Sequence, residues 1–172
     1  MMSFRKIIIS YRYRFASHRI SFMQNVRLLY VSKKTNQYPE VKNDLMQILN
    51  TAVDFNYRNE ITGVLYYGYG YFIQCIEGPK EKIDHLFYEK ILKDPRHQNC
   101  ELLFYIECED KLFKQWSMKF APINKDLQKF FIDHHFSNFN PYLLCNNTIP
   151  HFIKLLVDQP NIDPNKISFY NQ

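Results

Sequence analysis

Glycine and long hydrophobic runs are both scarce in this chain. Only four glycines occur in 172 residues, which argues against the glycine-rich loops that hold phosphates in many nucleotide-binding proteins. No segment approaches the roughly 18 consecutive apolar residues that a transmembrane helix requires. The composition therefore excludes a membrane-spanning protein and disfavours an enzyme with a phosphate-binding loop.

The four cysteines lack the spacing of a zinc site. They stand at positions 75, 100, 108 and 145, and no Cys-x-x-Cys pair occurs. The adjacent pair His134-His135 is no better suited, because neighbouring residues on a helix point about 100° apart. We therefore predict no metal site. Cys75 lies inside an apolar run and is interpreted as a buried thiol of a reducing compartment, which favours a cytoplasmic protein.

Positive charge is confined to the first 22 residues. This leader contains five basic and no acidic residues, and it accounts for the whole net charge of +5. Residues 23–172 are electrically balanced, so bulk electrostatics gives them no affinity for nucleic acid. The leader resembles an organelle transit peptide in composition, but Met23 directly precedes the first strand-like segment and would be a natural start. We expect residues 1–22 to be disordered or dispensable.

The rest of the chain is rich in apolar and aromatic residues, at 46% and 17% of the sequence, which is enough for one domain with a substantial core. Runs of β-branched and aromatic residues predict strands at 26–32, 61–67, 71–77, 100–108 and 116–120. Apolar residues at helical spacing predict helices at 40–55 and 79–92. The order β-α-β-β-α-β followed by a fifth strand predicts an α+β, ferredoxin-like domain, with two helices on one face of an antiparallel sheet.

Residues 124–172 form a second region with two further helical patterns. Its many phenylalanines need a surface to cover, and the open face of the sheet is the best candidate. We therefore expect a domain at 23–123 and a C-terminal helical extension at 124–172 that packs on the sheet.

Three polar side chains fall where the patterns predict burial. Gln74 lies in mid-strand on the same face as Phe72 and Ile76, Asn56 ends the apolar face of the first helix, and Tyr30 lies in the first strand. A buried amide without partners costs about 1–3 kcal/mol. Either these groups satisfy one another in a structural network, or a planar polar ligand lies between helix and sheet.

An RNA-recognition motif has the same strand order and is one alternative. The segment from Tyr67 to Gln74 imitates its signature of aromatic residues, which stack on unpaired bases. However, tyrosine replaces the leading basic residue and glutamine replaces the closing aromatic residue. Together with the neutral body of the chain, these differences disfavour RNA binding.

The polar residues also belong to a longer series of motifs. Along the chain come Tyr30-x-Ser32, Asn56 before Ile61-Thr62-Gly63, Gly70-x-Phe72-x-Gln74-x-x-Glu77-Gly78, Asp94-Pro95-Arg96-His97 and Trp116-Ser117-Met118. From about Val26 to Phe120, this series resembles the BLUF family, the blue-light sensors that use FAD. The C-terminal extension is similar to that of single-domain members, which have two helices and no fused output domain.

The resemblance implies a flavin held non-covalently between the two helices. Asn56 matches the amide that binds the pyrimidine edge of the flavin, and Tyr30 matches the tyrosine that gives an electron and then a proton to the excited flavin. Gln74 matches the bridging glutamine whose rearrangement shifts the absorption to longer wavelength. Trp116 and Met118 match the residues of the fifth strand that respond. Arg96 and His97 follow the second helix, where cations would meet ribityl or phosphate oxygens; for Arg96, a helix C-cap is an equal alternative.

The resemblance thus implies a blue-light photoreceptor that is not an enzyme and that signals to a regulatory protein partner; a homo-oligomer is compatible with the sequence. FAD is the expected cofactor, with FMN or riboflavin left open. One departure is Ala52, where many members have a serine, and this affects the expected lifetime of the lit state. The competing interpretation is a light-insensitive ferredoxin-like interaction module.

Overall fold

The computed structural model describes residues 24–35, 41–120, 125–134 and 139–159. The leader at 1–22 lies outside these residues, as do the last residues of the C-terminal extension, so the expectations about them stay predictions. None of the helices in the described ranges is long and apolar enough to cross a membrane.

A five-stranded sheet forms the centre of the molecule, in the order β4-β1-β3-β2-β5. The strands are β1 (Asn25–Lys34), β2 (Thr62–Gly68), β3 (Tyr71–Pro79), β4 (His97–Glu107) and β5 (Trp116–Phe120). The first four strands pair antiparallel and confirm the ferredoxin-like prediction.

The fifth strand differs from the expected all-antiparallel sheet, because β5 runs parallel to β2. The end of β4 pairs with the beginning of β1, whereas the first residue of β5 pairs with Gly63 near the beginning of β2. The connecting residues 108–115 therefore cross one end of the sheet from edge to edge. The strand that follows this crossing returns antiparallel to β4 and hence parallel to β2.

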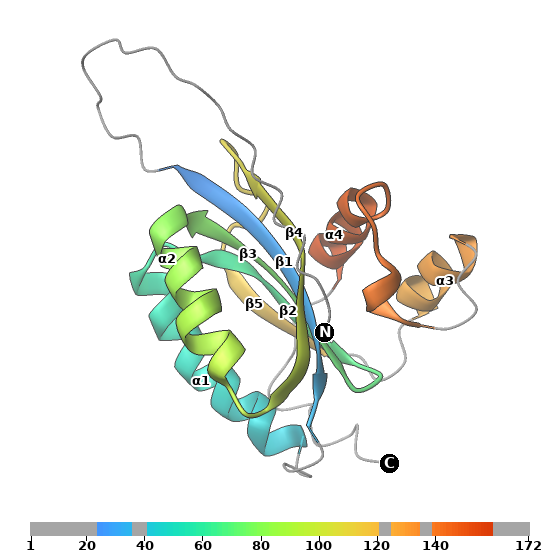
Figure 1. Ribbon diagram of the computed structural model, residues 1–172, viewed down its shortest axis with the longest axis horizontal. Coiled ribbons are helices and arrows are strands. Elements are labelled where there is room, and N and C mark those ends of the chain that lie inside the picture. Colours follow the sequence, from blue (N-terminus) through green and yellow to red (C-terminus); the bar gives the residue numbers. More distant parts are fainter. Residues whose placement is uncertain (1–23, 36–40, 121–124, 135–138, 160–172) are drawn as a thin grey trace, which may run out of the picture.

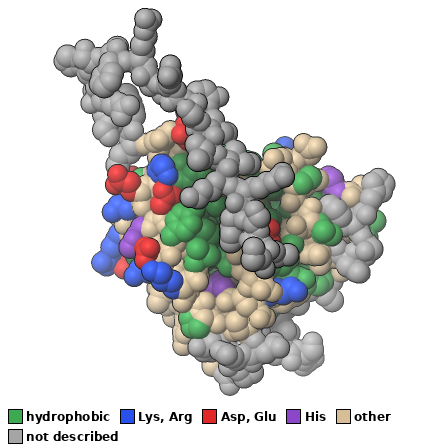
Figure 2. Space-filling model, viewed as in Figure 1, with side chains coloured by type: hydrophobic (Ala, Val, Ile, Leu, Met, Phe, Trp, Pro, Cys, Tyr) green, Lys and Arg blue, Asp and Glu red, His purple; other side chains and the backbone are tan. Residues whose placement is uncertain are grey.

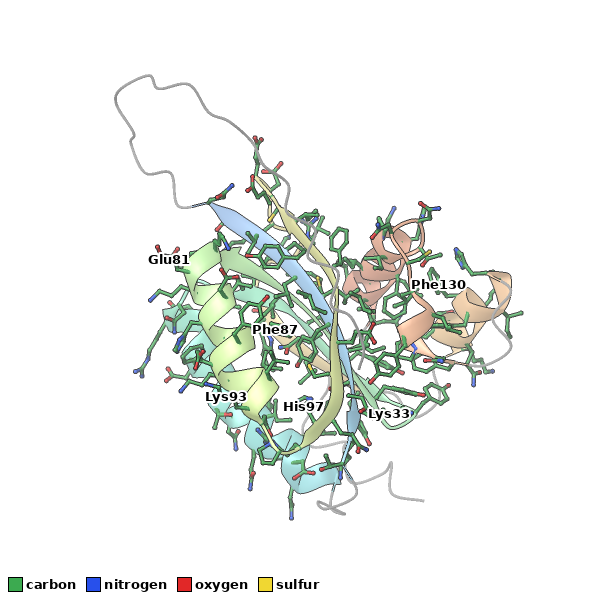
Figure 3. The ribbon with its side chains drawn as sticks, in the orientation of Figure 1. Lys33, Glu81, Phe87, Lys93, His97 and Phe130 are labelled. Carbon is green, nitrogen blue, oxygen red and sulfur yellow. The ribbon has the colours of Figure 1, made fainter. Side chains whose placement is uncertain are left out.

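Two helical segments cover one face of the sheet (Figure 1). They are α1 (Val41–Arg58) and α2 (Lys80–Asp84), which continues as a π-helical segment (His85–Lys90) and a 3₁₀ turn (Ile91–Lys93). This second helical segment begins at Lys80, one residue after the predicted start, because Pro79 is the last residue of β3. In Figure 3, Phe87 projects from the second helical segment toward the sheet, where it is buried in the core that both helices share with this face. Charged side chains of both signs lie over the outer surface of these helices in Figure 2.

The opposite face of the sheet carries the C-terminal helices (Figure 1). These are α3 (Lys125–Asp133) and α4 (Ile149–Asp158), with a 3₁₀ turn at Pro141–Leu143 between them. Their buried residues form a second core with the sheet residues that point away from α1 and α2, among them Val31, Val64 and Ile73. The sheet is therefore covered on both faces, and each face has its own core.

Close backbone approach explains the glycine at the start of β2. A Cβ atom on Gly63 would lie 2.2 Å from the carbonyl oxygen of Cys75 on β3, and the residue has a φ of +149°. Both features exclude larger residues at this position. At the turn between β2 and β3, the two positive φ values belong to Tyr69 and Gly70, so a tyrosine supplies one of the two left-handed conformations of this turn.

Candidate functional site

A cavity of about 240 Å³ lies between the two helices and the sheet. Its walls come from three regions that are distant in the sequence. They are the second half of α1 (Ile48, Thr51, Ala52, Phe55, Asn56), the sheet (Tyr30, Leu65, Gln74, His97) and the end of the second helical segment with its following loop (Leu86, Lys90, Ile91, Asp94, Arg96). A deep, largely apolar cavity with a few converging polar groups is the usual form of a cofactor site.

Tyr30 and Gln74 form a buried hydrogen bond on the cavity wall. They are direct partners in the β1–β3 register, and the Tyr30 hydroxyl donates to Gln74 Oε1 at 2.7 Å. Burial, followed by the nearby Cys100 and Asp94, raises the pKa of Tyr30 well above its usual value. The phenol is therefore fully protonated at neutral pH, and its proton is held against the glutamine. Because Gln74 Oε1 accepts this bond, the amide nitrogen is the end free to donate to another group.

Asn56 brings an unsatisfied acceptor to the cavity. It lies in the last turns of α1, where the apolar stripe of the helix turns toward the sheet, and only 1% of its surface is exposed. Its Oδ1 is buried and has no hydrogen-bond partner among the described residues. Since an unsatisfied buried acceptor costs about 1–3 kcal/mol, a ligand with a planar N–H edge fits this position.

His97 is a neutral member of the site, contrary to the expectation that it supplies a cation. Its ring packs on Phe72, with centroids 4.6 Å apart, and its Nδ1 shares a 2.6 Å hydrogen bond with the buried hydroxyl of Ser32. Burial lowers the pKa of His97 to about 4 and outweighs the opposing effect of Asp94. The imidazole is therefore uncharged at neutral pH and available for hydrogen bonding.

This protonation behaviour predicts that the fold loses stability in acid. The pKa of His97 is about 4 in the folded chain and about 6.5 when unfolded, so its contribution is fully present above pH 6.5 and is lost as the pH falls toward 4. Between pH 7 and pH 5 the loss amounts to about 2 kcal/mol. Urea unfolding at the two pH values measures it. A His97→Gln variant, which cannot titrate, should show a correspondingly smaller drop; an equal drop in both proteins would contradict the assignment.

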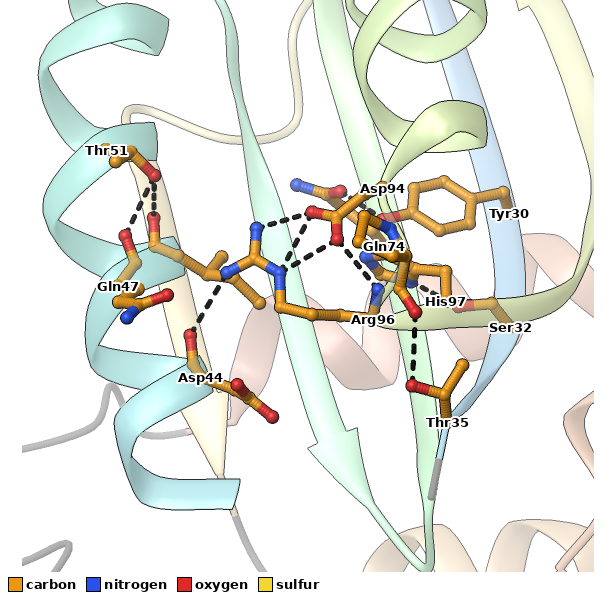
Figure 4. Close-up of polar contacts among 12 residues, drawn as sticks. Tyr30, Ser32, Thr35, Asp44, Gln47, Thr51, Gln74, Asp94, Arg96 and His97 are labelled. Atoms are coloured by element: carbon orange, nitrogen blue, oxygen red, sulfur yellow. Dashed lines mark hydrogen bonds and ion pairs between the residues drawn. The ribbon is translucent and has the colours of Figure 1, made fainter. Parts of the chain in front are cut away.

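Arg96 is held in an ionic cluster at the end of the cavity (Figure 4). Its guanidinium forms an ion pair with Asp94 through several hydrogen bonds, and its Nη1 donates to the carbonyl oxygen of Asp44 on α1 at 3.5 Å. Burial acts to raise the pKa of Asp94, but the bonds and charge of Arg96 outweigh it and lower that pKa. Arg96 thus links the loop to α1, and among the described residues its guanidinium does not bond to a carbonyl oxygen at the end of the second helix.

Trp116 of β5 lies beside the cavity and is not among the described residues that line it. Trp116 is 8% exposed and belongs to the core beneath α1 and α2. Its indole N–H is buried without a hydrogen-bond partner in the described part of the chain. Met118 pairs with Leu65 in the β2–β5 register, and Leu65 lines the cavity. Trp116 and the backbone of Met118 are therefore next to residues that line the site.

Lys90 is a site residue that the sequence interpretation missed. It is exposed at the cavity wall, and unlike Arg96 it has no ion-pair or hydrogen-bond partner among the described residues. The sequence could have indicated Lys90 through its position next to Ile91, the last residue of the apolar stripe of the second helix. Such a position lies at the border between the buried and the solvent-facing surface.

The RNA-binding alternative loses its physical basis in this structure. Stacking on bases requires exposed ring faces on the sheet. The rings at the aromatic positions of the motif are instead occupied by other rings: Tyr69 stacks on Phe139 with centroids 4.5 Å apart, and Tyr71 packs edge-on against Tyr142 at 5.9 Å. These two tyrosines therefore pack against the C-terminal region and do not present free faces to bases.

Known proteins resemble this chain in sequence and in structure. The family model described as "BLUF: Sensors of blue-light using FAD" matches residues 26–119, more than half of the chain. Among curated proteins, the photoactivated adenylate cyclase subunit beta of Euglena gracilis is 39% identical over 95 residues, which are 54% of this chain and 11% of that protein. The chain thus spans about a tenth of the length of this relative.

Two solved structures are similar over nearly their whole length. The photo-activated state of BlsA is 38% identical with a TM-score of 0.76, covering 81% of this chain and 99% of that one. The dark state of BlrB, a BLUF protein, is 29% identical with a TM-score of 0.63, covering 79% of this chain and 98% of that one. In both cases the similarity includes part of the region after β5, because it extends well beyond the residues of the family match.

Proposed function

The chain belongs to the BLUF family, the sensors of blue light using FAD, and on this premise we propose that its light response begins at Tyr30 and Gln74 and reaches a partner protein through the C-terminal helices. The observation that carries the proposal is the buried Tyr30–Gln74 hydrogen bond on the wall of the cavity. This bond places the redox-active phenol of Tyr30 next to the Gln74 amide, which carries both a hydrogen-bond donor and an acceptor.

The residues around the cavity fit a flavin. The unpartnered Asn56 Oδ1 would accept a hydrogen bond from the pyrimidine edge, and the Gln74 amide nitrogen would donate to the same ring system. Apolar side chains of both helices, Ile48 and Ile91 among them, would lie against the ring. Arg96 and the neutral His97, which also line the cavity, would bind ribityl oxygens.

When bound, FAD supplies the blue-absorbing chromophore and the electron acceptor. In our proposal Tyr30 would give an electron and then its hydroxyl proton to the bound flavin, with the proton passing through the Gln74 amide, and both would return to Tyr30 once the amide has rearranged. The amide then rearranges, so that its nitrogen faces Tyr30 and its oxygen is released. Because glutamine carries a donor and an acceptor on one planar group, both arrangements can be hydrogen-bonded, which is the requirement for a switch with two stable states.

The buried indole N–H of Trp116 is the group that we expect to respond to the rearrangement of the Gln74 amide. It lacks a partner among the described residues and lies on the same side of the sheet as Gln74. A rearranged Gln74 would offer an acceptor oxygen on that side, and satisfying the N–H would gain about 1–3 kcal/mol. We propose that β5, with Trp116 and Met118, transmits this change toward the C-terminal helices.

The output is proposed to be a contact with a regulatory protein rather than catalysis. The relatives named as cyclases are about nine times longer than the part they share with this chain, and that part corresponds to the sensor family. We propose that this receptor acts in the cytoplasm, since its four described cysteines are all free thiols. We also propose residues 23–123 as the sensor and 124–172 as the responding extension.

A visible absorption spectrum in the dark and after blue illumination tests the proposed response. We expect a bound-flavin band that moves reversibly to longer wavelength. A protein that binds FAD but shows no shift would overturn the roles given to Tyr30 and Gln74. A protein that binds no flavin would support the light-insensitive interaction module instead.

The unpaired Lys90 predicts a preference for phosphorylated flavins. Arg96 is occupied by Asp94 and His97 is neutral, so Lys90 is the cation that remains available among the described cavity residues. A Lys90→Gln change should weaken FAD and FMN binding about fivefold, the value of a partly exposed ion pair. Riboflavin, which has no phosphate, should be unaffected in the same fluorescence titrations.

Lys93→Gln is the matched control for this prediction. Lys93 lies one turn away, forms an ion pair with Glu89 and does not line the cavity. Equal weakening for riboflavin and FAD in the Lys90→Gln variant would mean that Lys90 supports the cavity itself rather than a phosphate.

A further inference from the structure

The β4–β5 loop (residues 108–115) is attached to the sheet by a buried carboxylate. Glu77 on β3 is completely buried, and its Oε2 accepts hydrogen bonds from the backbone N–H groups of Leu112 at 2.8 Å and Phe113 at 3.1 Å. Its Oε1 forms an ion pair with Arg27 of β1. One side chain of the sheet therefore holds two consecutive amides of the loop.

Two further hydrogen bonds, made by Arg27 and Lys111, also attach the loop to the rest of the domain. Arg27 Nη2 donates to the carbonyl oxygen of Asp110 at 3.1 Å, so the ion pair binds the loop at two places. Lys111 Nζ donates to the carbonyl oxygen of Glu60 at 2.6 Å. Buried charges are expensive unless they are paired and fully hydrogen-bonded, and here the carboxylate uses both of its oxygens. The arrangement is thus a built anchor rather than an incidental surface contact.

The anchor acts on the residues just before Trp116. The strand β5 has five residues, lies at the edge of the sheet and pairs only with β2, in parallel. Parallel pairing is slightly weaker per residue than antiparallel pairing, so such a short strand depends on what precedes it for its position. The two amides held by Glu77 come three and four residues before Trp116.

The same loop also reaches the second core. Phe113 is buried there together with Leu127 and Phe131 of α3 and with residues of α4. Glu77 comes three residues after Gln74 on the same strand, and it contacts the loop that joins Trp116 on one face to the C-terminal helices on the other. Glu77 and this loop thus connect the strand of Gln74 with Trp116 and with the second core.

We propose that Glu77 is a positioning residue that fixes the place of β5 and keeps Trp116 buried on the flavin side of the sheet. This inference rests on the proposed function for its role in signalling, but the placement of Trp116 is a property of the dark protein. Without the anchor, β5 loosens, Trp116 becomes accessible, and the lit state decays at a changed rate because its indole partner is no longer held in place.

Glu77→Gln tests this role, with Glu109→Gln as the matched control. Glutamine keeps the size of the side chain but loses the charge, and its single carbonyl oxygen cannot serve Arg27 and the loop amides together. Glu109 lies in the same loop, is exposed and has no hydrogen bond or ion pair with described residues. Trp116 is the single tryptophan of the chain, so tryptophan emission reports on β5 alone.

In the FAD-bound protein, kept in the dark and well below its unfolding transition, we expect the Glu77→Gln change to move the emission of Trp116 to longer wavelength. Quenching by acrylamide should rise severalfold, while Glu109→Gln changes neither quantity. FAD binding should persist in both variants, because Glu77 does not line the cavity. After illumination, the rate of dark recovery should differ severalfold from that of the unmodified protein only in Glu77→Gln.

Unchanged emission and quenching in a folded, flavin-bound Glu77→Gln variant would overturn the proposal. If Trp116 becomes exposed in Glu77→Gln but the unmodified protein shows no light response, the positioning role would be upheld and the photoreceptor mechanism refuted. If Glu77→Gln does not fold, hydrogen exchange in the unmodified chain decides: the amides of Leu112 and Phe113 should be strongly protected in the dark, and rapid exchange at these two amides would refute the anchor.

Discussion

A Gln74→Leu variant is expected to bind FAD and to show no light-induced shift of the flavin band. Leucine fills a similar volume but offers neither a donor nor an acceptor, so the hydrogen bond from Tyr30 at 2.7 Å is lost and no second arrangement exists. The loss of the shift should be complete, because in the proposed mechanism the shift arises from the hydrogen bonding of this one amide. The buried Tyr30 hydroxyl loses its partner as well, so stability should fall by about 1–3 kcal/mol.

Light-minus-dark absorption spectroscopy on the flavin-bound variant checks this prediction. Gln47→Leu provides the control, since Gln47 is an exposed glutamine of α1 that does not line the cavity. It should retain the full shift. A full shift in the Gln74→Leu variant would remove Gln74 from the mechanism and leave its burial as a purely structural feature.

A Tyr30→Phe variant is expected to lose the productive photocycle while it keeps the cavity. Phenylalanine preserves the ring, which packs on Phe87 with centroids 5.5 Å apart, but it cannot release a proton from a hydroxyl group. Illumination should therefore form no stable red-shifted state. Loss of one hydrogen bond to Gln74 should cost about 1 kcal/mol of stability, which leaves the variant folded for measurement.

Time-resolved absorption after a blue flash tests this expectation, and Tyr105→Phe is the matched control. The Tyr105 hydroxyl is also hydrogen-bonded, donating to Asp84 at 2.7 Å and accepting from Lys80 at 3.0 Å, but it does not line the cavity. The control should cycle normally. A normal red-shifted state in Tyr30→Phe would assign the electron and proton to another donor.

The two variants together separate the chemistry from the switch. Gln74→Leu retains the phenol and loses the rearranging amide, whereas Tyr30→Phe retains the amide and loses the donor. If both lose the shift while Lys90→Gln and Glu109→Gln retain it, the response is localised to the side-chain hydrogen bond between Tyr30 of β1 and Gln74 of β3.

Much of the fold was predictable from local pattern. The alternation of apolar residues in β1 and β3 and the stripe on α1 follow from periods of 2 and 3.6 residues, and their order along the chain indicates the ferredoxin-like arrangement. The same patterns identified Tyr30, Asn56 and Gln74 as polar residues at buried positions, which the structure bears out. The motif series then connected these residues with flavin.

Other features depend on contacts between distant parts of the chain. The direction of β5 follows from the crossing of residues 108–115 over one end of the sheet, and no local pattern records such a crossing. His97 is neutral because Ser32, Phe72 and the cavity wall surround it, whereas the sequence shows only a titratable residue beside an arginine. The pairing of Arg96 with Asp94 likewise leaves Lys90 as the available cation.

By itself, the sequence determined which elements form, which of their faces are buried and which polar residues must find partners there, since periodicity and side-chain chemistry are local properties. Only the tertiary structure decided that Tyr30 lies directly opposite Gln74, that Asn56 Oδ1 faces the cavity without a partner, and that Glu77 holds the loop before Trp116. Register, burial and electrostatic environment arise from segments brought together by folding, and they set the pKa values and hydrogen bonds on which the light response depends.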